Sequence, residues 1–154
     1  MVERAHISDI ASLTALRLEF LQEDCGELSG EIKSKLIEAL PAYFEKNLNH
    51  NIFCYLIREM EEVVACAFLL IVEKPANPMF ITGRTGTVLN VYTKPIFRHK
   101  GYAKAIMKTL LQDAVELNLS FVELESTEAG YDLYKSIGFT DDVSKYHCMK
   151  WFNV

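Results

Sequence analysis

Residues 87–110 constrain this chain most, because a strand pattern there passes through a basic loop directly into a helix pattern. Residues 88–93 are rich in β-branched side chains, and Pro95 ends the run because proline cannot donate a hydrogen bond to a sheet. Apolar residues then recur at helical spacing over residues 103–117. The sequence therefore predicts a buried strand that leads into an amphipathic helix through a short loop.

Three lysines of this helix are placed where they oppose its stability. Lys100, Lys104 and Lys108 lie four residues apart in the N-terminal half, where they repel one another and the positive end of the helix dipole. Each such charge costs a few tenths of a kcal/mol, up to about 1 kcal/mol. An anion bound at the helix start would reverse the sign of this effect. A solvated basic face is the alternative interpretation.

The loop before the helix has the residues of a phosphate-binding turn. Arg98 and His99 precede Gly101, which has no side chain and lets a ligand approach the backbone. The first N–H groups of the helix are free donors that point to the same place. We therefore expect an anion at the N-terminus of this helix.

Two motifs resemble those of the GCN5-related N-acetyltransferases (GNAT). Residues 98–103, Arg-His-Lys-Gly-Tyr-Ala, are similar to the R/Q-x-x-G-x-G/A signature, which in that family grips the pyrophosphate of acetyl-coenzyme A (acetyl-CoA). Residues 127–139 are similar to a second signature, A/G-x-x-L-Y-x-x-x-G-F, although Thr127 stands where many relatives have asparagine. Residues 90–95 also resemble the fourth strand of the family. Two separated signatures in the expected order are more specific than either one alone.

The resemblance implies a fold and an activity for residues 1–154 as one GNAT domain. The implied fold is α+β in three layers, with a mixed, mostly antiparallel sheet whose central parallel strand pair is flanked by helices. The implied activity is an N-acetyltransferase that moves the acetyl group of acetyl-CoA to an amine of a small molecule or peptide. A domain of the same fold that binds acyl-CoA without turnover, as a sensor or scaffold, is the alternative.

The resemblance also assigns residues to this site. Tyr134 would be the general acid at the leaving sulfur, and backbone groups of residues 91–93 would pair with the pantetheine arm. The general base stays open among Glu125, Glu123, Asn90 acting through a water, and no protein group. The residues expected to bind the cofactor are Val91, Tyr92, Thr93, Arg98, His99, Lys100, Gly101, Tyr102, Ala103, Lys104, Thr127, Tyr131 and Tyr134. The residues expected to be catalytic are Tyr134 and Glu125.

Composition limits the partners and the compartment. The 154 residues, half of them hydrophobic, suit one domain with a single core. A net charge of −5 argues against general binding to nucleic acid or an anionic membrane, because both need a basic face. The four cysteines show no paired spacing and no signal peptide is evident, so we expect reduced thiols in the cytoplasm. No metal site is expected. Exposed strand edges make a homodimer possible.

The rest of the chain is assigned by pattern. We expect strands at residues 2–6, 52–58, 63–72, 121–126 and 144–152. A helix capped by Ser8, a helix over residues 32–48 that Pro41 kinks or divides, and a short helix over residues 129–137 that ends at Gly138 should cover the sheet. Loops are expected at residues 22–30 and 73–86; the second is long enough to be either mobile or functional, and a lid over the acceptor site is one hypothesis.

Overall fold

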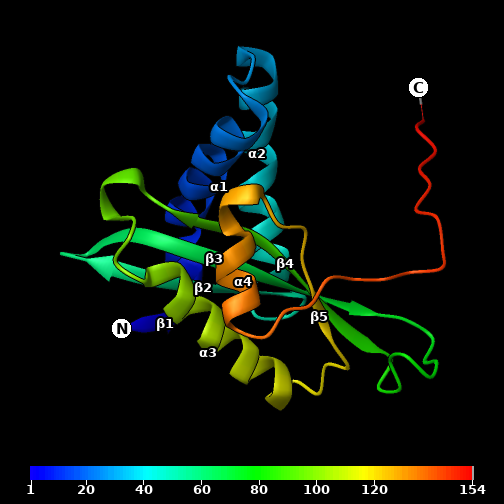
Figure 1. Ribbon diagram of the computed structural model, residues 1–154. Coiled ribbons are helices and arrows are strands. Elements are labelled where there is room, and N and C mark those ends of the chain that lie inside the picture. The colour runs from blue at the N-terminus through cyan, green and yellow to red at the C-terminus, as the bar shows by residue number, and fades with distance from the viewer. Residues whose placement is uncertain (154) are drawn as a thin grey trace.

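A five-stranded sheet forms the middle layer of the protein, in the strand order β1-β2-β3-β4-β5 (Figure 1). The computed structural model describes residues 1–153. The strands are β1 (Val2–Arg4), β2 (Ile52–Glu59), β3 (Glu62–Glu73), β4 (Arg84–Thr93) and β5 (Val122–Glu123). The first four pair antiparallel, and β4 pairs parallel with β5. This mixed sheet confirms the fold class expected from the sequence.

Helices cover both faces of the sheet (Figure 1). The α-helices are α1 (Ile10–Cys25), α2 (Gly30–Asn47), α3 (Tyr102–Glu116) and α4 (Tyr131–Ser136). The short 3-10 helices η1 (Ile7–Asp9), η2 (Pro95–Phe97) and η3 (Glu128–Gly130) lie before α1, α3 and α4. The pair α1 and α2 packs on one face, and α3 packs on the other.

Neighbouring side chains of β2 enter two separate cores. Leu56 is buried with Phe44 of α2, whereas Tyr55 is buried with Ile106 of α3. A strand that is covered on both faces can be apolar at every position, which explains the unbroken apolar run at residues 63–72. The antiparallel hairpin expected from β2 and β3 is confirmed.

The beginning of the chain differs from expectation in two places. Ser8 lies inside η1 and does not cap α1; the Asp9 carboxylate instead accepts a hydrogen bond of 2.8 Å from the His6 N–H. The loop predicted at residues 22–30 is shorter, because α1 continues to Cys25 and Ser29 already caps α2. Its Oγ accepts the Ile32 N–H at 3.2 Å.

The helix containing Pro41 is not divided. It runs as one element, α2, and proline removes only a single backbone hydrogen bond from it. Leu40 and Phe44 on either side pack against the core, and this burial offsets the lost bond.

The loop predicted at residues 73–86 is shorter than expected. The strand β4 begins at Arg84, so only residues 74–83 form the loop. This loop enters β4 at one end of the strand, whereas the basic turn follows Thr93 at the other end. The loop and the basic turn therefore lie at opposite ends of β4, and a lid over the acceptor site stays a hypothesis.

The end of the chain differs most. The strand expected at residues 121–126 contains only Val122–Glu123, and the helix expected at 129–137 is divided into η3 and α4. Gly138 has φ +104°, as expected for a helix stop. No strand forms at residues 144–152, which extend away from the sheet (Figure 1). Among the described residues β5 is therefore the edge of the sheet, and the parallel pair is not central.

Asp113 on α3 joins three elements. Its Oδ2 accepts the hydroxyl of Tyr55 at 2.8 Å and the Arg4 guanidinium at 2.7 Å. Asp113→Ala is expected to lower the free energy of unfolding by about 1–3 kcal/mol, because the buried Tyr55 hydroxyl loses its acceptor. Urea denaturation checks this value. In a Tyr55→Phe background the same change should cost less, and an equal cost would contradict the explanation.

Candidate active site

The parallel strands β4 and β5 separate soon after they meet. They pair only at Gly86 with Val122 and at Thr87 with Glu123. Beyond Thr87, the described part of β5 offers no partner to β4. The main-chain edge of residues 88–93 therefore faces an open cleft.

A β-bulge at Asn90 accompanies this separation. Cys66 of β3 pairs with Tyr92, but Phe68 pairs with Leu89, so two β4 residues face one β3 residue. A bulge bends its strand and increases the twist. Asn90 has φ +54°, a left-handed conformation that asparagine tolerates better than most residues.

The buried side chain of Asn90 is held at both ends. Its amide Nδ2 donates to the Cys66 Sγ at 3.4 Å, and its Oδ1 accepts from the Arg17 guanidinium at 3.3 Å. Burial raises the pKa of the Cys66 thiol to about 12, so this sulfur stays protonated. These contacts fix the bulge, and hence the course of the strand beside the cleft.

The basic loop forms the turn expected at the start of α3. Gly101 is the N-cap with φ +80°, and no side chain caps the helix. The first intrahelical bond of this turn runs from the Ala105 N–H to the Gly101 carbonyl at 3.0 Å. The N–H groups of residues 102–104 precede that bond and are free to bind an anion. No acidic residue lies in this first turn.

One cleft of about 830 Å³ contains most of the predicted residues. It runs from the N-terminus of α3 along β4 to α4. The predicted residues that line it are Val91, Tyr92, Thr93, Arg98, His99, Gly101, Tyr102, Ala103, Lys104, Glu125, Thr127 and Tyr134. The separation of the strands thus places the two sequence signatures on the walls of one cavity.

Two predicted residues lie outside this cleft lining. The Lys100 Nζ sits over the Phe97 ring at 5.1 Å from its centroid. The Tyr131 hydroxyl is directed to the Asp141 carboxylate, at 2.9 Å from Oδ2. Both residues belong to the sequence motifs, but neither is among the residues that line the cleft.

Arg98 is held by partners within the chain. Its Nη2 lies 2.6 Å from the Glu23 carboxylate at the end of α1, and its Nε donates to the Thr93 carbonyl at 2.9 Å. Its guanidinium also lies 5.7 Å from the Tyr92 ring centroid. The bond to Glu23 raises the pKa of Arg98, which is charged throughout the physiological range. Arg98 therefore ties α1 to the basic turn.

Tyr134 presents a phenol to the cleft from α4. Its side chain is half-buried, and desolvation raises its pKa above the ordinary value, so the hydroxyl is protonated at neutral pH. The ring packs edge-on against Phe139 with centroids 5.9 Å apart. A Cβ on Gly130 would lie 2.9 Å from the Tyr134 ring, so only glycine leaves room for the ring here.

The predicted carboxylates of the strand after α3 have different positions. Glu125 is exposed and lines the cleft, whereas Glu123 is exposed and lies 3.5 Å from the Thr87 hydroxyl. Thr127 caps η3, where its Oγ1 accepts the Gly130 N–H at 3.3 Å. Of the two glutamates, Glu125 is the one that lines the cavity.

Several lining residues were missed in the sequence. Phe20, Glu23 and Asp24 come from the end of α1. Phe20 was expected in a helix but not in the site, and Glu23 and Asp24 fall in residues 22–30, whose turn-like composition predicted a loop. Gly130 and Leu133, which also line the cleft, are the A/G and L positions of the second signature, although neither was assigned a role in the site. The motif was the signal that could have found both, and the glycine also marks a close approach.

The cysteines, the grouping of metal-binding side chains and the length of the helices bear on the compartment and metal content expected from the sequence. All four cysteines are free thiols, and Cys54 and Cys66 are buried. Within residues 1–153, no group of three or more histidine, cysteine or acidic side chains gathers as a metal site would require. The helices among these residues are too short or too polar to cross a membrane.

The cleft joins the free N–H groups at the N-terminus of α3 to the open edge of β4, an arrangement that suits a long ligand with an anionic end. Fold and cleft together define the class of acyltransferases that use coenzyme A thioesters. The chain belongs to the Acetyltransferase (GNAT) family, whose model matches residues 16–139.

Several solved structures share this fold. A predicted acetyltransferase from Clostridium acetobutylicum, solved with acetyl-CoA, is 26% identical, with a TM-score of 0.83 over 97% of this chain and 95% of that one. A GCN5-related N-acetyltransferase from Ralstonia eutropha JMP134 is 20% identical, with a TM-score of 0.79 over 97% of each chain. A ribosomal-protein-alanine N-acetyltransferase from Brucella melitensis biovar Abortus 2308 is 21% identical, with a TM-score of 0.69 over 97% and 99%. No curated protein sequence matches.

Proposed function

We propose that this protein transfers the acetyl group of acetyl-CoA directly to an amine. The observation that carries the proposal is one cleft that brings together the α3 N-terminus, the unpaired edge of β4 and the Tyr134 phenol. A binding module would need the first two features, but it would have no use for a phenol directed at the reacting sulfur. This difference favours an enzyme over a sensor or scaffold.

The donor would be held mainly by main-chain groups. The N–H groups of residues 102–104 suit its diphosphate, and the half-buried Lys104 adds a positive charge at the same turn. The pantetheine arm would lie against β4 as an added strand. A β4 N–H directed at the thioester oxygen would stabilise the charge that develops there, an effect worth about 3 kcal/mol of the barrier.

The reaction requires one bond to form and one to break at the thioester carbon. The lone pair of the neutral amine attacks the carbonyl, the C–N bond forms, and the C–S bond breaks with its electrons on sulfur. The Tyr134 phenol would protonate that sulfur or donate a strong hydrogen bond to it. The attacking nitrogen loses a proton, and solvent restores the phenol.

The cleft suggests a cationic acceptor. Glu23, Asp24 and Glu125 line it, and a protonated amine would be attracted to these carboxylates before it loses its proton. Glu23 already has a partner in Arg98, so Asp24 and Glu125 are the available groups. We propose an amine of a small molecule or peptide.

The four free thiols support placing the protein in the cytoplasm.

We assign Glu125 as the group that takes the amine proton. Glu125→Gln is expected to lower turnover about 10-fold, less than the ~100-fold typical of a well-positioned base, because Glu125 is exposed and water can replace it. Initial rates of thiol release across pH would show the loss. Glu123→Gln is the matched control, since this neighbouring carboxylate does not line the cleft. Equal losses in the two variants would contradict the assignment.

A panel of amines tests the activity itself. Acetyl-CoA is incubated with polyamines, aminoglycosides, amino acids and peptide N-termini, and free thiol is measured by a colorimetric reagent. At least one amine should accelerate thiol release and yield an acetylated product by mass spectrometry. Tight binding of acetyl-CoA with no acceleration by any amine would favour the sensor or scaffold instead.

A further inference from the structure

Residues 142–153, here called the C-terminal segment, contain no helix or strand and leave the body of the protein (Figure 1). The segment carries large apolar side chains that are exposed to water, with fractions from 72% for Phe152 to 94% for Val143. These side chains are Val143, Tyr146, Met149, Trp151 and Phe152. Concentrated apolar surface of this kind marks an interaction site.

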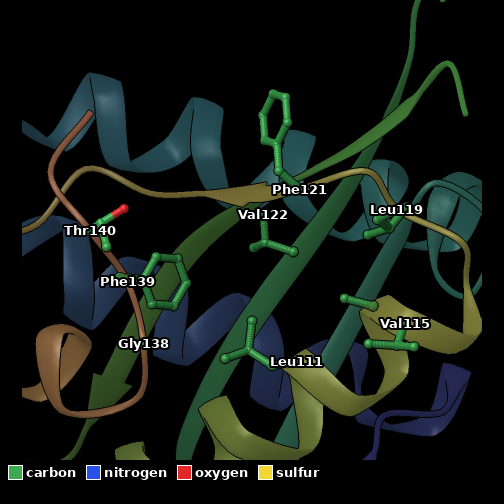
Figure 2. A pocket seen from close by; sticks show the side chains of 9 residues that line it. Leu111, Val115, Leu119, Phe121, Val122, Gly138, Phe139 and Thr140 are labelled. Carbon is green, nitrogen blue, oxygen red and sulfur yellow. The ribbon is translucent and has the colours of Figure 1, made fainter. Parts of the chain in front are cut away.

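An apolar groove of about 410 Å³ lies between α3 and β5. Figure 2 shows Leu111 and Val115 of α3 on one side and Val122 of β5 on the other. Phe139 closes one end of the groove. None of the lining residues is charged, and Val115 is 78% exposed. The groove thus offers an uncharged, mostly apolar surface to apolar side chains.

The groove runs beside an unpaired strand edge. The strand β5 pairs with β4 on one side, and it is the last strand of the described sheet. An extended segment can pair with such an edge and place alternate side chains over the groove. In a strand, Met149 and Trp151 of the C-terminal segment would share one face, and Tyr146 and Phe152 the other. Apolar side chains on both faces suit a sheet that is covered on both sides.

The point where the C-terminal segment leaves the domain indicates whether it fills the groove of its own chain or that of a second copy. Gly138, Phe139 and Thr140 line the groove, so the chain leaves the domain from the groove's own wall. To fill this groove itself the segment would have to reverse, but after Gly138 the sequence contains no glycine or proline. Twelve extended residues reach about 40 Å, enough to enter a neighbouring molecule.

We propose that two copies of this chain exchange their C-terminal segments. Each segment adds a strand to the free edge of β5 in the other copy and covers the other groove. A two-fold axis makes the exchange reciprocal, so the assembly closes at two copies. This inference is independent of the catalytic proposal, because it concerns a surface on the other side of β5 from the cleft residues of β4.

Trp151 is the only tryptophan in the chain, so its fluorescence reports the environment of the C-terminal segment. We expect light scattering after size exclusion to give twice the 17.6 kDa of one chain. In that dimer the Trp151 emission should lie at short wavelength, as expected of a buried indole. Dilution to the monomer should shift the emission to long wavelength.

Two variants test whether the dimer forms through this groove or through another surface. Val115→Asp places a charge in the groove at an exposed position, and it should give a monomer with long-wavelength emission. Met60→Asp is the matched control, because Met60 is 99% exposed on the β2–β3 turn, and it should remain a dimer. Circular dichroism confirms that each variant is folded. A chain lacking residues 142–153 provides a second monomer if Val115→Asp fails to fold.

Mixing distinguishes exchange from simple packing. Val115→Asp retains its C-terminal segment, and the truncated chain retains its groove, so the two monomers together should form a heterodimer with short-wavelength emission. A wild-type monomer would overturn the proposal, whether Trp151 is buried or exposed. A dimer that keeps Trp151 exposed, or that survives truncation, would overturn it as well.

Discussion

Tyr134→Phe is expected to lower kcat by about 100- to 10,000-fold with the best amine of the panel, and to leave acetyl-CoA affinity nearly unchanged. The change removes only the hydroxyl, while the ring keeps its contacts with Gly130 and Phe139. Because burial raises the pKa of Tyr134, wild type presents the protonated phenol that a leaving sulfur needs. Steady-state thiol release gives kcat, and calorimetry gives the affinity.

Tyr131→Phe is the matched control for this experiment. It removes the same atom from the same helix, but the Tyr131 hydroxyl is bonded to Asp141 and does not line the cleft. We expect this variant to turn over at the wild-type rate. If Tyr134→Phe also turned over at that rate, Tyr134 would not be the acid, and solvent would have to protonate the sulfur.

Gly101→Val is expected to weaken acetyl-CoA binding about 100-fold or more, which corresponds to about 2.7 kcal/mol. Gly101 has φ +80°, and a β-branched residue strongly disfavours this conformation. The turn would have to change its backbone, and the N–H groups of residues 102–104 would no longer converge on the diphosphate. A Cβ at this position meets no atom within 4 Å, so the valine would also project into the space left for the ligand. Titration calorimetry with acetyl-CoA measures the change.

Gly26→Val is the matched control, because it introduces a similar backbone strain at a glycine outside the cleft. Gly26 has φ +83°, lies in equally open space after α1, and does not line the cleft. Both variants should lose thermal stability, but only Gly101→Val should lose affinity. Wild-type affinity in Gly101→Val would show that the phosphates bind elsewhere.

Features set by local chemistry could be predicted from the sequence. The turn at Gly101 follows from a strand, a proline and a helix within twenty residues, and Tyr134 follows from a motif contained in one helix and its stop. The covered strands β2 and β3 were recognisable because burial on both faces leaves an unbroken apolar run. In each case the signal and the structure lie in the same short segment.

Features set by distant contacts could not be predicted. The ion pair of Glu23 with Arg98 joins residues 75 positions apart, and the sequence around either residue does not indicate its partner. The bulge at Asn90 depends on Cys66 and Arg17, which come from two other elements. The prediction of a strand at residues 144–152 was wrong for a related reason. A strand forms only when it pairs with another strand, and the sequence pattern of one segment does not show which strand, or which chain, is its partner.

The ion pair between Glu23 and Arg98 has a consequence for the order of events at the site. Arg98 lines the cleft beside the basic turn, so a diphosphate bound there would compete with Glu23 for its guanidinium, and loading the donor would loosen the tether at the end of α1. A freed Glu23 would then join Asp24 and Glu125 as a third available negative charge lining the cleft. We expect the acceptor to arrive at a more anionic site once the donor is seated, which would make binding sequential, with the thioester first and the amine second.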